Sequence, residues 1–542
     1  MSKTSCGSPT RHNSIAFLIL IVVIFSTLRV SAAADDSLAV PTRDGRLQGV
    51  ARRGGGAEFL GIPYAQPPIG ALRWHEPLPP KPWDNTRDAT AFGAPCAQPA
   101  LGDWNRHDAE TGKEDCLFLN VIVPAWPVTK QLPVMFWIHG GANEGGTASS
   151  GLYKDGTLVN HGVLLVTVNY RLGIFGFLAH PELTAESAHG ASGNYGLMDQ
   201  ILALRWVREN IAKFGGDPSN ITVFGQSAGA MDTGMLMTSS AKGLFQKAIA
   251  QSGASFTAPV PTLVDAEQTG KKLAADLKAA DPKAPAGTGA IQYLRQLSAP
   301  QLLTALANFD HAKRPHLGPD IDSWVLRRSP AEIFAYGQES AIPLLFGTTT
   351  REFGSSASPE ELRVTIAHAA GNFADKALAG YGLAGDGNGV TDAMYGTAAD
   401  QWVADMAFRC PSVTQATWHN AAHHPTYEYE FTHAIPGQES NGAVHSADLP
   451  YVFGYFPKSG NIAGKFSEVD TKLSELIETY WTNFAKTGDP NSDSLPYWHQ
   501  FGDEHSYIRF MQDGSVAVAK DLRSAQCNVY REFLTAHLKP AN

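Results

Sequence analysis

The sequence is poor in charged residues for its length. They make up 17% of its 542 residues, whereas a disordered chain would be much richer in charge. Acidic residues outnumber basic ones by 52 to 42, giving a formal net charge of −10, so the positive excess that attracts nucleic acid is missing. We therefore expect a folded protein with no nucleic-acid partner.

Long apolar runs are also missing, except for one near the N-terminus. Residues 15–28, IAFLILIVVIFSTL, follow basic residues and precede the small residues 31–34, which is the pattern of a secretory signal peptide. The run is shorter than the roughly 20 residues that span a bilayer, so an uncleaved anchor is the weaker alternative. We predict a signal peptide at residues 1–34, removed on export, and a secreted or periplasmic protein without stable membrane insertion.

Cysteine is scarce, with five residues in all. Cys6 falls in the predicted signal peptide, and Cys96, Cys116, Cys410 and Cys527 remain. An even number in an exported chain favours disulfides, although spacing alone supports only the near pair Cys96–Cys116, and free buried thiols are the alternative. The short CxxC spacing of structural zinc sites does not occur among them.

From residue 133 onward, short apolar segments alternate with helical ones. Residues 133–140 and 163–170 are rich in β-branched and aromatic residues, as strands buried on both faces are. Residues 196–214 show helical spacing and stop at a Gly-Gly-Asp-Pro breaker, before the strand Ile221–Phe224. This alternation predicts an α/β fold whose large, mostly parallel sheet is covered by helices.

The flanking segments complete this prediction. Residues 45–53 and 57–64 look like an antiparallel N-terminal extension of the sheet. Residues 262–308 predict a helical insertion, with a flexible linker between domains as the alternative, before strand character returns. We expect residues 35–542 to form a single domain.

The strongest chemical motif is Gly-Gln-Ser-Ala-Gly at residues 225–229, between the strand and a following helix. A sharp strand-to-helix turn pushes the hydroxyl of Ser227 out of the sheet, and the turn needs small flanking residues. Such a pentapeptide also occurs by chance in ordinary loops, so its surroundings must decide.

Those surroundings resemble the type-B carboxylesterase family, which includes the cholinesterases. The similar strings include EDCLFLN at residues 114–120, NYRLGIFGFL at 169–178 and FGGDPSNITVFGQSAG at 214–229, and the resemblance extends from residue 60 to residue 491. It implies an α/β-hydrolase fold, hydrolysis of a small-molecule carboxylic ester, and no cofactor.

The resemblance also implies a catalytic triad. A serine hydroxyl needs a base to accept its proton and a third group to orient that base. His445, in NGAVHSADLPYVFG, and Glu352, in FGTTTREFG, match the family's histidine and acid and follow Ser227 in the expected order. Phe353 stands where the family usually has glycine. The alternative for Glu352 is a surface ion pair with Arg351.

The oxyanion hole implied by the resemblance comprises the backbone N–H groups of Gly141, Ala142 and Ala228. The family usually has glycine at position 142 and apolar residues after it, where this chain has Asn143 and Glu144. Any residue except proline keeps the N–H donor. The changes therefore concern the conformation of the loop and the acyl groups that it admits.

Further matches come with the resemblance. Ser252 and Asp448 match positions behind the catalytic histidine, and Gln226 replaces a glutamate that many members have, which argues against choline esters. Trp104 resembles the tryptophan on which cholinesterases stack a cation, although a structural tryptophan is the simpler interpretation. Cys410 and Cys527 resemble the family's long-range disulfide.

His419, His423 and His424 include a His-x-x-x-His spacing that suits a metal, but HExxH is missing, so we expect an exposed helix end and no metal.

Two alternatives to a general esterase remain. One is a specialised hydrolase of polar, aromatic, mycotoxin-type or polyester substrates, in which Asn143 and Glu144 read a hydroxyl or an amine. The other is a non-catalytic binding protein on the same fold, as in neuroligin-like relatives. The sequence does not predict the oligomeric state.

Overall fold

The computed structural model describes residues 38–257, 259–309 and 315–539. The chain divides into the units Met1–Asp36 and Ser37–Asn542. The predicted signal peptide at residues 1–34 lies outside the described residues. Among the residues that are described, no helix is both long and apolar enough to cross a membrane.

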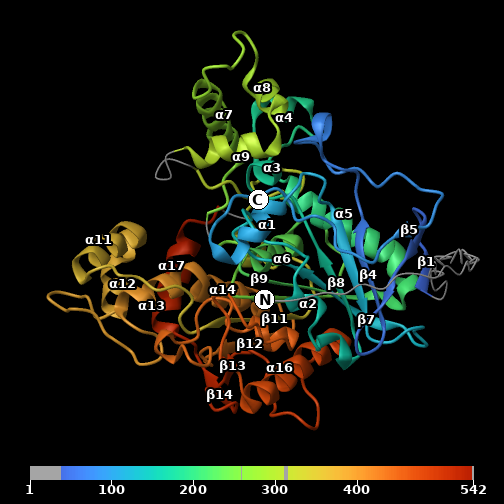
Figure 1. The fold of residues 1–542 in the computed structure, drawn as a ribbon. Coiled ribbons are helices and arrows are strands. Elements are labelled where there is room, and N and C mark those ends of the chain that lie inside the picture. Colours follow the sequence, from blue (N-terminus) through green and yellow to red (C-terminus); the bar gives the residue numbers. More distant parts are fainter. Residues whose placement is uncertain (1–37, 258, 310–314, 540–542) are drawn as a thin grey trace, which may run out of the picture. The chain divides into compact units, whose positions relative to one another are not determined.

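An eleven-stranded sheet forms the centre of the second unit (Figure 1). Its middle strands, from β8 through β13, pair in parallel, and antiparallel pairs occur toward the two edges. The predicted α/β fold with a mostly parallel sheet is confirmed. In spatial order the strands are β14 (Val516–Lys520), β13 (Ser506–Phe510), β12 (Thr426–Phe431), β11 (Leu344–Thr349), β10 (Lys247–Gln251), β9 (Gly216–Gln226), β7 (Leu132–Ile138), β8 (Leu164–Val168), β6 (Phe118–Val123), β4 (Ala57–Pro63) and β3 (Val50–Ala51).

The N-terminal extension differs in part from the prediction. Residues 45–53 divide between two sheets: β3 joins the large sheet, whereas β2 (Arg46–Gln48) joins β1 (Ala39–Pro41) and β5 (Arg87–Asp88) in a small one. The chain changes sheets at Gly49, where a Cβ would lie 2.5 Å from the Phe59 ring. Only glycine fits so close an approach.

Side chains of the central strands alternate between two hydrophobic cores. Along β7, Phe136 and Ile138 belong to one core and Trp137 to the other. Helix α5 (Tyr195–Asn210) covers the first face and α16 (Glu468–Thr487) the second. Both faces of the sheet are therefore buried, which explains why the sequences of these strands are continuous apolar runs.

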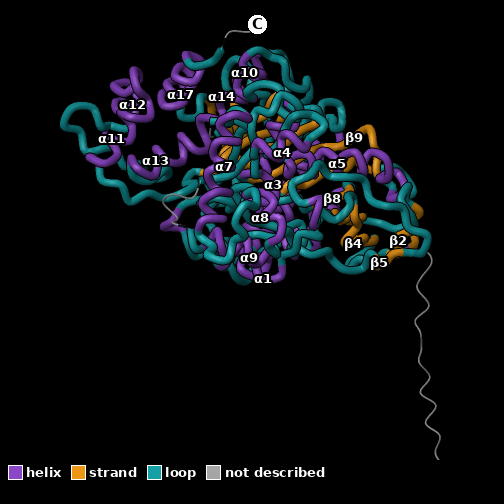
Figure 2. Tube along the Cα trace, turned by 90° about the horizontal axis from the view of Figure 1, so that it is seen from above, coloured by secondary structure: helices purple, strands orange, loops and turns teal. Residues whose placement is uncertain are grey.

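Helices join the sheet in two insertions (Figure 1). The insertion predicted at residues 262–308 forms α7 (Leu263–Ala279), α8 (Ala290–Gln296) and α9 (Ala299–Ala307), and the chain then returns to the sheet as β11. A second group, which the sequence did not suggest, packs around its own small core and against α17, as Figure 2 also shows. It consists of α11 (Pro359–Ala370), α12 (Ala374–Gly380) and α13 (Ala398–Ala404), and α17 spans Ser524–Ala536.

Two disulfides brace the loops and helices. Cys96 bonds to Cys116, and Cys410, at the start of α14 (Cys410–Ala421), bonds to Cys527 in α17. Both predicted pairings are confirmed. The remaining α-helices are α1 (Arg106–Thr111), α2 (Gly151–Lys154), α3 (Gly173–Phe177), α4 (Pro181–Glu186), α6 (Ala228–Thr238), α10 (Pro330–Ala335) and α15 (Leu449–Phe453).

Candidate active site

Ser227 occupies the turn between β9 and α6. Its backbone has a positive φ of 58° with ψ −125°, a strained combination for a residue other than glycine, and its N–H donates to the Gln251 carbonyl at 2.9 Å. A Cβ on Gly225 would lie 2.4 Å from the Gly229 carbonyl, and one on Gly229 would lie 2.1 Å from the Ile138 carbonyl oxygen. The glycines on both sides are therefore needed for a strained turn that presents the serine at the carboxyl end of the sheet.

The loop after β7 packs directly against this turn. A Cβ on Gly140 would lie 2.6 Å from the Gln226 carbonyl oxygen. Gly141, Ala142 and Asn143 follow with φ values of 113°, 58° and 57°. Ala142 thus adopts a left-handed conformation that favours glycine, at a cost of about 1–2 kcal/mol. The loop thus keeps a conformation typical of glycine although residue 142 is alanine.

Asn143 explains how the loop is held in this strained state. Its amide oxygen accepts a hydrogen bond from the Tyr170 hydroxyl at 3.0 Å, and its amide nitrogen donates to Asp232 at 3.0 Å. Asp232 accepts a second hydrogen bond from Gln200, and the Asn143 side chain is buried. The Asn143 side chain, to which the specialised-hydrolase alternative assigned substrate recognition, therefore uses its polar atoms inside the protein. Sequence reasoning missed Asp232, Tyr170 and Gln200, whose positions carry no motif.

Burial raises the pKa of Asp232 to about 6, although the hydrogen bonds from Asn143 and Gln200 lower it in part. The folded protein therefore holds a proton that the unfolded chain releases near pH 3.8, and folding stability falls as the pH rises from about 4 to about 6. At about 1.4 kcal/mol for each tenfold change in proton affinity, this carboxyl lowers the free energy of unfolding by about 3 kcal/mol over that window.

Asp232→Asn is expected to remove this pH dependence. The new amide suits the site if Gln200 turns, because the Gln200 amide oxygen is buried without a hydrogen-bond partner among the described residues. Denaturant unfolding of wild type and variant at pH 4, 5, 6 and 7 measures the effect. The stability difference between the two proteins should change by about 3 kcal/mol across the series; parallel curves would contradict the role of Asp232.

His445 and Glu352 meet at the carboxyl end of β11. The His445 Nδ1 lies 2.6 Å from Glu352 Oε2, and the Thr349 N–H donates to Oε1 at 2.9 Å. Glu352 is buried, whereas the Arg351 guanidinium donates to backbone carbonyls, including that of Met394. The alternative of a surface ion pair between Arg351 and Glu352 is therefore wrong.

The pKa of Glu352 reflects opposing effects. Burial raises it, but the hydrogen bond and charge of His445, helped by Ser252 and the Thr349 N–H, bring it below its ordinary value. The Ser252 hydroxyl is buried and influences Glu352, but it forms no regular hydrogen bond with another described residue. Asp448, the other residue expected behind the histidine, instead accepts hydrogen bonds from Gln251 and Tyr429.

The second nitrogen of the His445 ring contacts Gln226. Gln226 Nε2 lies 3.1 Å from His445 Nε2, while the Ser227 hydroxyl has no hydrogen-bond partner in the described part of the chain. Because His445 Nδ1 is engaged by Glu352, Nε2 is the acceptor and the Gln226 amide is the donor. Free-state hydrogen bonds of catalytic groups are often long and tighten only with substrate.

Two phenylalanines hold the histidine ring. The centroids of Phe353 and Phe408 lie 4.6 and 4.8 Å from that of His445. Phe353, which replaces the usual glycine of the family, thus packs on His445 while remaining 48% exposed. Trp104 is 47% exposed and borders the loop after β7, because a Cβ on Gly141 would lie 3.2 Å from its ring.

Gln226→Glu is expected to lower activity at mildly acidic pH, so that the pH range in which the enzyme is active becomes narrower. A carboxylate beside His445 Nε2 favours the imidazolium, which cannot accept a proton, so the acid limb of the kcat/KM profile should move up by about 1 pH unit. Gln226→Met, which is similar in size and uncharged, is the control: it removes only the hydrogen bond that the amide donates to the neutral ring, so the limb should move up by clearly less than in the glutamate variant. An unshifted profile in the glutamate variant would show that residue 226 has no electrostatic influence on His445.

The serine on a strand-to-helix turn of a mostly parallel sheet and the nearby histidine–carboxylate pair define the α/β-hydrolase class. The Carboxylesterase family model matches residues 36–530. The chain therefore belongs to the carboxylesterase family, the type-B branch that its motifs resemble.

Individual relatives agree with this assignment. The para-nitrobenzyl esterase of Bacillus subtilis is 37% identical over 502 residues, covering 90% of this chain and 96% of the relative. The fumonisin B1 esterase of Sphingopyxis macrogoltabida is 35% identical over 491 residues, covering 88% of this chain and 87% of the relative. The crystal structure of a Geobacillus stearothermophilus carboxylesterase superposes with a TM-score of 0.78 at 32% identity, covering 91% of this chain and 100% of its own. The protein is a carboxylic ester hydrolase.

Proposed function

We propose that the protein is an exported serine carboxylesterase acting through Ser227, His445 and Glu352. The Ser227 Oγ forms a bond to the ester carbonyl carbon while its proton passes to His445 Nε2, displacing the Gln226 amide from that nitrogen. His445 then gives the proton to the leaving alcohol as the acyl–enzyme forms. Water repeats the two steps and releases the acid. Glu352 holds the ring in the tautomer that leaves Nε2 free to accept.

The N–H groups of Gly141, Ala142 and Ala228 stabilise the tetrahedral oxyanion in this proposal. The contact between Gly140 and the serine turn supports it, because it sets the loop beside the reacting atom. No cofactor enters these steps. Because His445 must be neutral to accept a proton, activity should fall in acid.

The observation that carries the proposal is the 2.6 Å contact between His445 and the buried Glu352. Hydrolysis of p-nitrophenyl esters of increasing acyl length by the purified protein tests it, and the optimum length reports the acyl pocket. Saturable turnover that is lost on treatment with an organophosphonate is expected. If a folded sample shows no turnover and does not react with the organophosphonate, the alternative of a non-catalytic binding protein is favoured.

Export and domain organisation form part of the proposal. We infer that residues 1–34 are removed and that residues 35–542 work as one domain; the two disulfides support an oxidising destination. Intact mass of the protein recovered outside the cytoplasm of the expression host tests the cleavage. A mature chain that begins after residue 32 or 34 is expected, and a full-length exported chain would contradict the inference.

A specialised substrate is the second candidate, and Glu144 favours it. The Glu144 carboxylate lies 3.3 Å from His316 Nδ1 and borders a pocket of about 850 Å³. It directly follows the loop proposed to stabilise the oxyanion, so in this proposal its negative charge lies beside the path of the substrate. The likeness to the fumonisin B1 esterase makes a fumonisin-type ester one candidate substrate.

Glu144→Gln tests this candidate. Because a carboxylate attracts a cationic group, KM for an ester with an amine in its acyl chain should rise about 5- to 50-fold, while KM for the uncharged ester of equal length stays within about twofold. Equal effects on both esters would assign Glu144 a role in the loop alone.

A further inference from the structure

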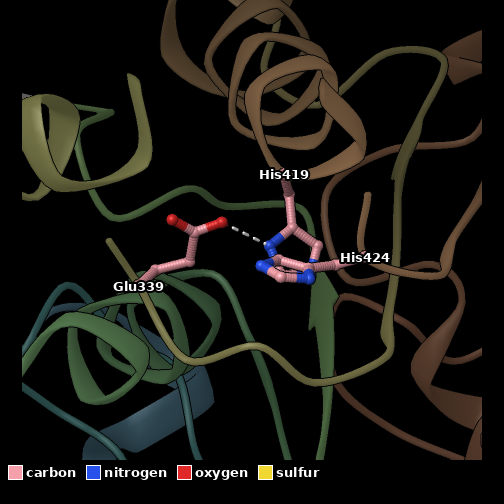
Figure 3. Close-up of side chains that lie close together, drawn as sticks. All are labelled: Glu339, His419 and His424. Atoms are coloured by element: carbon pink, nitrogen blue, oxygen red, sulfur yellow. Dashed lines mark hydrogen bonds and ion pairs between the residues drawn. The ribbon is translucent and has the colours of Figure 1, made fainter. Parts of the chain in front are cut away.

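We propose that Glu339, His419 and His424 bind a divalent transition-metal ion, with zinc as the natural candidate. Figure 3 shows the two imidazole rings and the carboxylate converging from the end of α14 and from the segment between α10 and β11. Each of the three residues offers one ligand atom, and these three atoms lie within 4.8 Å of one another.

The convergence corrects the expectation of an exposed helix end. His419 is fully buried. Helix α14 ends at Ala421, and His423 then takes a left-handed φ of 63°, which turns the chain back and brings His424 beside His419. The centroids of these two rings lie 4.8 Å apart, whereas His423 is exposed. The two histidines that converge are thus not the pair with helical i,i+4 spacing.

The hydrogen bonds of His419 fix which nitrogen faces the site. His419 Nε2 lies 2.8 Å from the Ile342 carbonyl oxygen, which can only accept, so Nε2 carries the proton. A histidine that binds a metal usually donates its other N–H to a carbonyl or carboxylate in this way. Nδ1 is the nitrogen that faces Glu339.

That arrangement calls for a cation between His419 and Glu339. Nδ1 lies 2.7 Å from Glu339 Oε1, and two acceptors at this distance repel unless a proton or a metal ion lies between them. The other carboxylate oxygen, Oε2, is buried without a hydrogen-bond partner among the described residues. A proton on Nδ1 satisfies His419 and Oε1 but leaves Oε2 without a partner, whereas a metal ion can bind the carboxylate and also engages His424.

The donor set suits zinc or cobalt. Two imidazole nitrogens and one carboxylate oxygen are three protein ligands, and a fourth position remains for water. With metal–ligand distances of about 2.0–2.2 Å, tetrahedral ligands lie about 3.3 Å apart, so Glu339 and His419 must separate by roughly half an ångström. Because His424 is partly exposed, the ion can enter from solvent.

The position in the fold indicates a structural role. Ile342 precedes β11, whereas Glu352 follows the other end of the same strand, so the metal and the catalytic histidine would lie at opposite ends of β11. A bound ion would tie α14 to the segment before β11. Lys242 donates to the Glu339 carbonyl at 3.3 Å, and its charge weakens cation binding.

A titration with Co²⁺ tests the proposal. The whole mature protein is first freed of metal with a chelator, and Co²⁺ binding is then monitored by visible absorption. We expect one equivalent to bind with an intense tetrahedral band, Zn²⁺ to displace it, and Zn²⁺ to raise Tm by about 2 °C or more. Turnover of a p-nitrophenyl ester should stay within about twofold, because the reacting groups are at the far end of the strand.

His424→Ala is the decisive variant, because it removes one ligand and leaves the buried His419–Glu339 pair intact. Affinity for Co²⁺ should fall at least about 30-fold and the Zn²⁺-dependent rise in Tm should vanish, while the Tm without metal is unchanged. His423→Ala is the matched control and should bind as the wild type does. Equal Co²⁺ binding in wild type and His424→Ala, or none in either, would overturn the proposal and leave a proton as the bridge.

Discussion

Replacing Ser227 by alanine is expected to lower kcat for a p-nitrophenyl ester by about 10⁵-fold or more. The methyl group cannot form the acyl–enzyme, so the reaction has to proceed by direct attack of water. The residual rate should still exceed that in buffer, because the N–H groups of Gly141, Ala142 and Ala228 can stabilise an oxyanion that water creates. Removing one atom at a strained turn tests the mechanism without removing the site.

Initial rates over a range of substrate concentrations measure this effect, with circular dichroism to check the fold. Ser492→Ala is the control, because Ser492 is an exposed serine and its loss should leave kcat unchanged. A variant at Ser227 that keeps more than about a tenth of the wild-type kcat would exclude an acyl–Ser227 intermediate.

Replacing Glu352 by glutamine should lower kcat/KM by about 10³- to 10⁴-fold. The glutamine amide can donate to His445 Nδ1, and this forces the ring proton onto Nε2, the nitrogen that has to accept the proton of Ser227. The substitution keeps the shape of a fully buried side chain. A large kinetic loss with an unchanged fold would therefore come from the tautomer and the missing charge.

Glu360→Gln, at an exposed position, is the matched control and should have wild-type kinetics. The loss should persist across the neutral pH range, because the wrong tautomer does not depend on a titration in that range. A loss of less than about tenfold would mean that another group orients His445.

The architecture was largely readable from the sequence because the central strands are buried on both faces. Their apolar runs, as in β7 and β8, could be told from the helical spacing of α5, and the alternation fixed the class of sheet. The division of residues 45–53 between two sheets was not readable, since it depends on the contact of Gly49 with Phe59. Strand pairing of this kind is decided by partners distant in sequence.

The same distinction holds for the site. Ser227, Glu352 and His445 stand in local motifs, and the structure brings Glu352 and His445 together, while their catalytic role stays a prediction. The Asn143–Asp232 contact joins residues 89 positions apart and no motif announces it. The burial of His419 was missed for a related reason: helical spacing pointed to His423, but the left-handed turn at His423 brings His424 beside His419 instead.

The central claim is that Ser227 is the nucleophile, and its most direct test is covalent labelling of the wild-type protein. After treatment with a p-nitrophenyl alkylphosphonate, one equivalent of nitrophenol should be released, and peptide mass spectrometry should locate a single phosphonyl group on Ser227. The account predicts that labelling and loss of esterase activity proceed together. Complete inactivation with the phosphonyl group on any other residue, or turnover that survives full labelling of Ser227, would contradict it.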